Sequence, residues 1–172
     1  MTSIDRRREI KKLLLNSKEP VTGQELAVIY EVTRQVIVRD IAIMRAEGLD
    51  IISTPKGYMV IKDDKKNLRT VIAVNHSRDD MEEELKIIVK YGAVVEDVIV
   101  EHPLYGEMRG MLMLKSMYDV ENFYNRFKDY SAEPLSALTN GVHLHTIICE
   151  NKDMINSITK ELSEKGFLVN SL

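Results

Sequence analysis

The first sixty residues consist of amphipathic segments separated by short polar breaks. Between Ile4 and Leu15 the apolar residues fall on one face of a helix, with Arg and Lys between them. Thr22 and Glu25 have the spacing of a capping box, so a second helix is expected from Gly23 to Tyr30. A third is expected from Arg34 to Glu47, where apolar residues recur at helical spacing. The pattern predicts three consecutive helices.

Two short β-prone runs follow these helices, Ile51–Ser53 and Tyr58–Ile61. The residues between them include Pro and Gly, which is a hairpin signal. Three helices followed by a hairpin are typical of a winged helix-turn-helix. Residues 1–62 are therefore predicted to form a DNA-binding domain, with the third helix in the major groove and the hairpin as its wing.

The residues expected to contact DNA lie on the outward side of the third helix and at the wing tip: Thr33, Arg34, Gln35, Val38, Arg39 and Lys56. Arg and Gln suit base edges, Thr and Val suit a thymine methyl group, and Lys suits phosphate. The first helix is expected to carry a strongly basic outer face (Arg6, Arg7, Arg8, Lys11 and Lys12), which also favours DNA. A protein-interaction module with solvated charges is the alternative.

The pattern changes after a charged run from Lys62 to Arg69, interpreted as a linker. The strands expected beyond it are Thr70–Val74, Ala93–Glu101, Met108–Lys115, Val142–Cys149 and a short Phe167–Val169, and the helices are Arg78–Tyr91, Val120–Tyr130 and Lys152–Lys165. Strands interleaved with helices predict an α+β fold. Residues 70–172 are expected to form a small α/β sandwich, a mainly antiparallel sheet with helices on one face.

Charge and composition narrow the class of protein. The net charge is −3, but residues 1–60 hold ten Lys or Arg and eight Asp or Glu, whereas the rest holds fourteen and nineteen. A mildly basic front half is compatible with nucleic-acid binding. The single cysteine, Cys149, allows no intrachain disulfide, and no apolar run reaches the roughly 18 residues of a membrane span. The start lacks a signal-peptide pattern, so a cytoplasmic protein is expected.

Two histidines in an otherwise apolar strand, His143 and His145, raise a question of burial. Alternation along the strand places both on one face, with α-carbons about 7 Å apart. Glu84 falls within the apolar arc of a predicted helix, and His76 precedes that helix. A buried carboxylate needs a counter-charge, which a divalent cation supplies. These four residues are therefore a candidate three-His, one-carboxylate metal site, although two ordinary half-buried histidines remain the alternative.

A second candidate group lies where a strand ends: His102, Tyr105 and Arg109. Arg can hold a carboxylate, Tyr can stack, and His can hydrogen-bond, so these residues could bind a small anionic ring. A turn with polar surface groups explains them equally well.

Longer motifs resemble known families. The stretch "VTGQELAVIYEVTRQVIVRDIAIMRAEGLDI" is similar to the helix-turn-helix of biotin-repressor-like regulators, without their ligase loop. "VNHSRDDMEEEL", "VEDVIVEHPLYGEMRG" and "GVHLHTI" resemble the 3H domain over about residues 70–172. Together the two parts resemble the niacin-responsive transcriptional repressors.

That resemblance implies a function. A homodimer would bind a palindromic operator, with nicotinic acid as co-repressor, and would repress genes of NAD biosynthesis or niacin uptake. One divalent transition metal per chain, zinc or nickel, would be held by His76, Glu84, His143 and His145. The chain would not be an enzyme. A metal-sensing regulator is the first alternative and a small metallohydrolase the second, although no further acid stands out as a general base.

Overall fold

The computed structural model describes residues 1–61 and 66–169. The chain divides into two compact units, residues 1–63 and 64–172, and each is described by itself. Part of the predicted linker, residues 62–65, lies outside the described residues. None of the helices in the described residues is long and apolar enough to cross a membrane.

The N-terminal unit has three helices and a two-stranded hairpin: α1 (Ser3–Asn16), α2 (Gly23–Ile29), α3 (Arg34–Ala46), β1 (Ile51–Thr54) and β2 (Gly57–Val60). Each helix buries the apolar stripe that its spacing predicts, and the stripes meet in one core that includes Ile10, Leu26, Ile37 and Ile41. The capping box forms as expected, since Thr22 Oγ1 and the Glu25 side chain each accept the other residue's N–H. This is a winged helix-turn-helix, as predicted.

The wing turn depends on a glycine. Gly57 has φ +134°, and a Cβ there would lie 2.5 Å from the backbone of Val21. Val21 and the neighbouring Tyr58 exchange backbone hydrogen bonds of 2.8 and 2.9 Å. A side chain at position 57 would therefore push the wing away from the residue that precedes α2.

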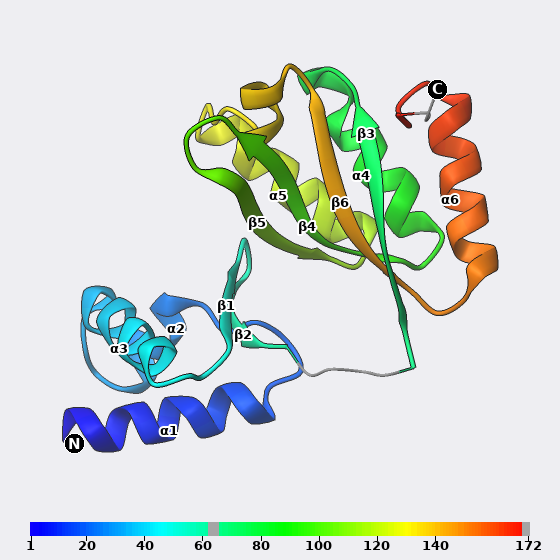
Figure 1. Cartoon of the computed structure of the whole chain (residues 1–172). Helices are drawn as coiled ribbons and strands as arrows, with labels where there is room; N and C mark the ends of the chain where they lie inside the picture. Colours follow the sequence, from blue (N-terminus) through cyan, green and yellow to red (C-terminus); the bar gives the residue numbers. More distant parts are fainter. Residues whose placement is uncertain (62–65, 170–172) are drawn as a thin grey trace. The chain divides into compact units, whose positions relative to one another are not determined.

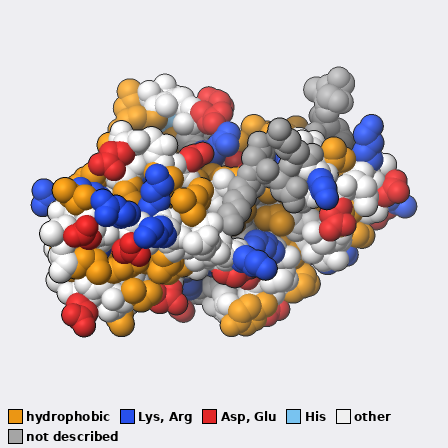
Figure 2. All heavy atoms as spheres, turned by 90° about the horizontal axis from the view of Figure 1, so that it is seen from below, with side chains coloured by type: hydrophobic (Ala, Val, Ile, Leu, Met, Phe, Trp, Pro, Cys, Tyr) orange, Lys and Arg blue, Asp and Glu red, His pale blue; other side chains and the backbone are white. Residues whose placement is uncertain are grey.

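The prediction of a strongly basic outer face on α1 is wrong in part. Arg6 Nε lies 2.6 Å from Asp40 Oδ2 and Arg7 Nη1 lies 3.4 Å from Asp40 Oδ1, and Asp40 on α3 is buried. The periodicity could not show this acceptor, because Asp40 is 33 residues or more away in sequence. Towards solvent, Arg8 and Lys12 pair with acidic neighbours on the same helix. Figure 2, which views the chain from the α1 side, shows blue and red side chains interspersed there.

The C-terminal unit contains a four-stranded sheet with helices on one face, as predicted (Figure 1). Its elements are β3 (Leu68–Asn75), α4 (Met81–Lys90), β4 (Val94–His102), β5 (Gly106–Leu114), α5 (Met117–Asp129), β6 (Val142–Cys149) and α6 (Lys152–Glu164), with 3-10 turns η1 (Arg78–Asp80) and η2 (Leu135–Thr139). The strand order is β3-β6-β4-β5, and every neighbouring pair is antiparallel. The last strand in sequence is therefore inserted between the first two.

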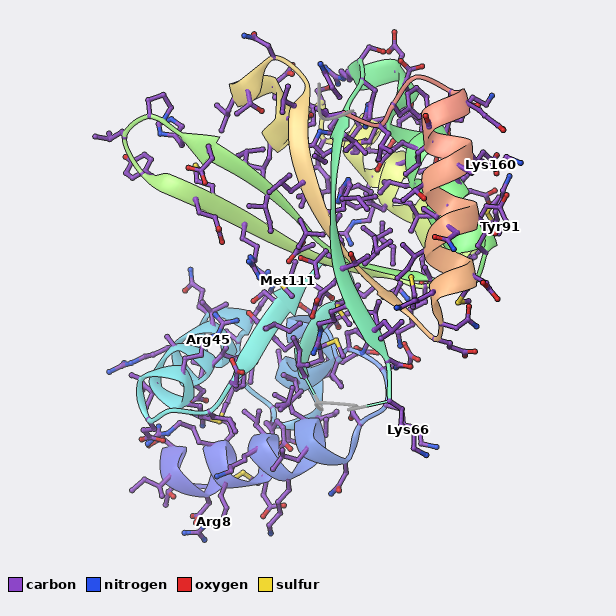
Figure 3. The ribbon with its side chains drawn as sticks, turned by 45° about the vertical axis from the view of Figure 1, so that its right-hand side comes forward. Arg8, Arg45, Lys66, Tyr91, Met111 and Lys160 are labelled. Atoms are coloured by element: carbon purple, nitrogen blue, oxygen red, sulfur yellow. The ribbon has the colours of Figure 1, made fainter. Side chains whose placement is uncertain are left out.

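The core of this unit lies between the sheet and the helices. Ile72, Ile88, Val95, Ile147 and Leu162 bring one apolar side chain from each of five elements into it. Between the helices, the Tyr91 hydroxyl at the end of α4 donates to Glu161 Oε2 on α6 at 2.6 Å. Figure 3 shows Tyr91 beside α6.

Four local predictions for this unit need correction. Leu68 and Arg69 belong to β3 rather than to a linker, because β6 pairs with all eight residues of β3. Ser77 does not cap the next helix: its hydroxyl donates to Asp80 Oδ2, and the helix opens with η1. The loop before β6 contains η2. The short C-terminal strand is reduced to a single bridge between Val74 and Leu168.

Candidate metal and DNA-binding sites

The outward face of α3 presents the residues expected to contact DNA. Thr33 caps the helix by accepting the N–H of Val36, and all five predicted contact residues at this end are exposed: Thr33, Arg34, Gln35, Val38 and Arg39. Lys56 lies in the turn between β1 and β2, where its N–H donates to Thr54 Oγ1. The geometry is compatible with a recognition helix in the major groove and a wing over the phosphate backbone.

The wing is tied to the recognition helix by Arg45. Its Nε donates to the carbonyl oxygen of Ile51 at 2.7 Å and its Nη2 to Ser53 Oγ at 2.8 Å. Figure 3 shows Arg45 near the end of α3. The spacing between the two predicted DNA-contacting elements is thus fixed by side-chain contacts, which the sequence pattern did not reveal.

The four predicted metal ligands meet in the C-terminal unit. His76 follows β3, Glu84 lies on the buried face of α4, and His143 and His145 occupy neighbouring positions on the helix-facing side of β6. Glu84 has no exposed surface, and both strand histidines are buried. The register explains the convergence, because Val74 and Ile72 on β3 pair with His143 and His145.

Ligand atoms of three of these residues are close enough to share one ion, and the fourth, His145, approaches Glu84. Glu84 Oε2 lies 3.4 Å from His76 Nε2, and Glu84 Oε1 lies 3.2 Å from His145 Nε2. Candidate ligand atoms of His76, Glu84 and His143 all lie within 4.8 Å of one another. The rings of His143 and His145 are 4.9 Å apart, edge to face. One carboxylate thus lies between the histidines, with a different imidazole at each oxygen.

All three histidines hold their Nδ1 atoms against main-chain carbonyl oxygens. The distances are 2.8 Å from His76 to Ser77, 2.8 Å from His143 to Gly141 and 2.6 Å from His145 to Asp97. A carbonyl only accepts, so each Nδ1 carries the proton and donates it. In the neutral ring each Nε2 then keeps its lone pair, directed towards the cluster, which is how metal-ligating histidines are held by their outer partners.

Several buried polar atoms at the centre of the cluster lack a hydrogen-bond partner: His76 Nε2, His145 Nε2 and both carboxylate oxygens of Glu84. Buried polar groups are nearly always satisfied, and an unsatisfied one is costly. A late transition metal would satisfy all four atoms at once, and imidazole with carboxylate is a donor set that zinc accepts. The residues present therefore fit the ion that the sequence predicts.

The electrostatics of the cluster follow from burial and from its single carboxylate. Burial opposes the charged form of Glu84, yet the adjacent histidines hold its pKa well below the usual range. Burial likewise opposes imidazolium at His76 and His145, but Glu84 outweighs it and raises the pKa of both. His143 is different, because burial and the neighbouring His145 lower its pKa to about 4. Protons on two histidines partly replace a cation here.

Asp97 supports this cluster, and sequence reasoning missed it. The β4–β6 register shifts between Val95 and Ile99, and this irregularity brings the Asp97 carbonyl to His145. Its carboxylate accepts the N–H of Thr146 at 2.8 Å and has no exposed surface. An acidic residue in an apolar strand was the available signal, but only strand pairing identifies its partners.

The three predicted effector residues lie on two parts of the β4–β5 hairpin. His102 and Tyr105 are together at the turn, with ring centroids 5.1 Å apart. His102 Nδ1 there accepts backbone N–H groups of the turn. Arg109 forms ion pairs with Asp97 and Glu107 instead. The assignment of these residues to an effector stays a prediction.

Comparisons with known proteins agree with this architecture. Residues 6–59 match the model of an HTH domain, and residues 69–171 match that of the 3H domain. The chain is 43% identical over 165 residues to a protein of Thermotoga maritima named probable transcription repressor NiaR, covering 96% of this chain and 94% of that protein. It is 36% identical over 168 residues to the transcription repressor NadR of Bacillus subtilis, covering 96% and 93%.

An uncharacterized protein of Methanothermus fervidus shares 33% identity over 101 residues, 55% of this chain and 16% of that protein. The two full-length relatives are named as repressors, which supports the expectation that this chain is not an enzyme. With both domain types matched in order and similarity over nearly the whole length, the chain belongs to the NiaR-type family of transcription repressors, in which a helix-turn-helix domain precedes a 3H domain.

Proposed function

We propose that this chain is a nicotinic-acid-responsive repressor of genes for NAD biosynthesis or niacin uptake, acting in the cytoplasm as a homodimer on palindromic operator DNA. The resemblance to niacin-responsive repressors and the name of the Thermotoga maritima relative support this identity. The effector half of the proposal is supported by the histidine–glutamate cluster, in which buried nitrogen and oxygen atoms of His76, His145 and Glu84 have no hydrogen-bond partner.

The metal would be zinc or nickel, one per chain, held by His76, Glu84, His143 and His145. When bound it would supply an electrophilic centre for a ring nitrogen or a carboxylate. The protein's own part is to fix three imidazoles in one tautomer and to exclude water around Glu84. Nicotinic acid must bind the DNA-competent state of the dimer more tightly than the other state, because otherwise the equilibrium would not shift.

The test is operator binding by the full-length protein, measured by fluorescence anisotropy on a fragment selected in vitro. Metal-replete protein should bind more tightly when nicotinic acid is added, and His143→Ala should lose both metal and this response. Equal affinity with and without saturating nicotinic acid would refute the co-repressor role. Tight operator binding triggered by added zinc alone would instead favour the metal-sensor alternative.

A further inference from the structure

A cavity of about 230 Å³ adjoins the histidine–glutamate cluster. Its lining comes from three segments: residues 76–78, residues 133, 134, 136 and 137, and residues 140–141. His76 belongs to both the cavity wall and the cluster, so the two are contiguous. The volume lies below the roughly 300–1,000 Å³ of pockets for drug-sized ligands, and it therefore suits a molecule with a single ring.

Backbone packing fixes the floor of this cavity. Asn75 pairs with Val142 where the end of β3 lies beside the start of β6 (Figure 1). Gly141 has φ +96°, and a Cβ there would lie 2.6 Å from Asn75 Oδ1 and 2.7 Å from the carbonyl oxygen of His76. A side chain at position 141 would thus force the two strand ends apart. The part of the cavity formed by His76 and Gly141 is therefore held in place by the fold itself.

Arg78 is the cation in the cavity wall. Its guanidinium carbon lies 4.8 Å from the ring centroid of Phe127, which is buried, and its Nη1 lies 3.0 Å from Glu133 Oε1. The aromatic face orients the guanidinium without using its hydrogen-bond donors. The Arg78 and Glu133 side chains are 43% and 71% exposed, so solvent screens their attraction and the pair contributes little to folding.

We propose that this cavity receives the carboxylate end of the effector, with Arg78 as its counter-ion, and that the bound carboxylate replaces Glu133 on the guanidinium. This inference rests on the proposed function, and it assigns recognition of the effector's carboxylate to Arg78. Replacement is easy because a displaced Glu133 is already largely hydrated. The planar guanidinium matches a carboxylate in two parallel hydrogen bonds.

Arg109 is a poorer candidate for this role. One of its partners, Asp97, has no exposed surface. Drawing Arg109 towards a ligand would leave a buried carboxylate without its counter-charge, which is far more costly than hydrating Glu133. Arg109 is therefore committed within the fold, whereas Arg78 is available to a ligand.

The experiment is calorimetric titration of full-length, metal-replete protein with nicotinic acid and with nicotinamide, which lacks the carboxylate. Arg78→Gln should raise the Kd for nicotinic acid at least about tenfold. It should leave the Kd for nicotinamide and the metal content, measured by elemental analysis, unchanged. Lys160→Gln, which removes an exposed positive charge of α6 that does not line the cavity, should leave the Kd for nicotinic acid unchanged. Glu133→Gln, at a mostly exposed position, should lower that Kd, because it removes a competing charge.

The outcomes separate the two proposals. An equal Kd for nicotinic acid in wild type and Arg78→Gln, or a higher Kd in Glu133→Gln, overturns the inference and leaves the proposed function standing. An equal loss in Lys160→Gln and Arg78→Gln would show a general effect of net charge and would also overturn the inference. If the wild type binds no nicotinic acid, the proposed function fails and the inference fails with it.

Discussion

The Nδ1 atom of His145 lies 2.6 Å from the main-chain carbonyl oxygen of Asp97, although 48 residues separate the two in sequence. The bond forms because β4 changes register against β6 at this point. It holds the imidazole as the Nδ1–H tautomer and directs Nε2 towards Glu84. An irregularity in strand pairing thus orients a candidate metal ligand.

Removing the Asp97 carboxylate should disturb this arrangement. We expect Asp97→Ala to lose about 1–3 kcal/mol of stability, because the buried N–H of Thr146 loses its acceptor. Zinc affinity should also fall roughly 10–100-fold, because the Asp97–Thr146 hydrogen bond holds the main chain of Asp97 beside β6 and so keeps its carbonyl oxygen against His145. Urea unfolding and competition with a chelating dye measure the two effects. Asp97→Asn keeps an acceptor oxygen and is the control, so an equal loss of zinc affinity in both variants would contradict the role of this hydrogen bond.

The pH dependence of zinc binding follows from the raised pKa of His76 and His145. Raised folded-state values mean that imidazolium stabilises the metal-free protein fully below the unfolded value of about 6.5, and that this stabilisation is lost as pH rises through the folded values. Zinc must displace these protons. The gain in Tm on adding zinc should therefore grow from pH 6 to pH 8. A gain that is constant over this range would contradict proton displacement, and chelator-treated protein at each pH is the reference.

Much of the site could be predicted from the sequence. Alternation along β6 placed His143 and His145 on one buried face, and helical spacing placed Glu84 among apolar residues. Both are local patterns with a fixed period. The insertion of β6 between β3 and β4, which brings Asp97 to His145, depends on pairing between distant segments. No local period encodes that pairing, so the contact between Asp97 and His145 could not be predicted from the sequence.

Arg34 should contribute to DNA binding and should have no effect on ligand binding by the C-terminal unit. We expect Arg34→Ala to weaken binding to a selected operator by about 1–3 kcal/mol, since Arg pairs with base edges or phosphate at such positions. Binding of nicotinic acid should be unchanged. Arg8→Ala is the control, because Arg8 is an exposed α1 arginine paired with Asp5. If both variants bind the operator equally well, Arg34 is not a contact; anisotropy at fixed salt decides this.

Asp40 should be a stability determinant of the N-terminal unit. We expect Asp40→Ala to cost about 3–5 kcal/mol, because it removes the buried partner of Arg6 and Arg7 and detaches α1 from α3. Denaturant unfolding followed by circular dichroism measures the loss. The exposed pair of Glu9 and Lys12 is the comparison, and Glu9→Gln should change stability by less than about 1 kcal/mol. Similar small losses in both variants would show that Asp40 is not an anchor.

The basic residues of α1 illustrate a limit of reading charge from sequence. Five cations in the first helix suggested a DNA-facing surface, yet Arg6 and Arg7 are used within the fold. The sequence showed that these residues are positively charged, but it did not show which of them face solvent. Helical spacing gives the face of a residue, but a long side chain can still bend towards an acceptor on a neighbouring helix.

Glu84 meets a different imidazole at each of its two oxygens. Because protons on those rings can neutralise the carboxylate by themselves, we expect the C-terminal unit to stay folded, and resistant to proteolysis, in a cell depleted of the ion. Loss of the cation would then inactivate the protein reversibly, and rebinding of the ion would restore its activity without synthesis of new protein.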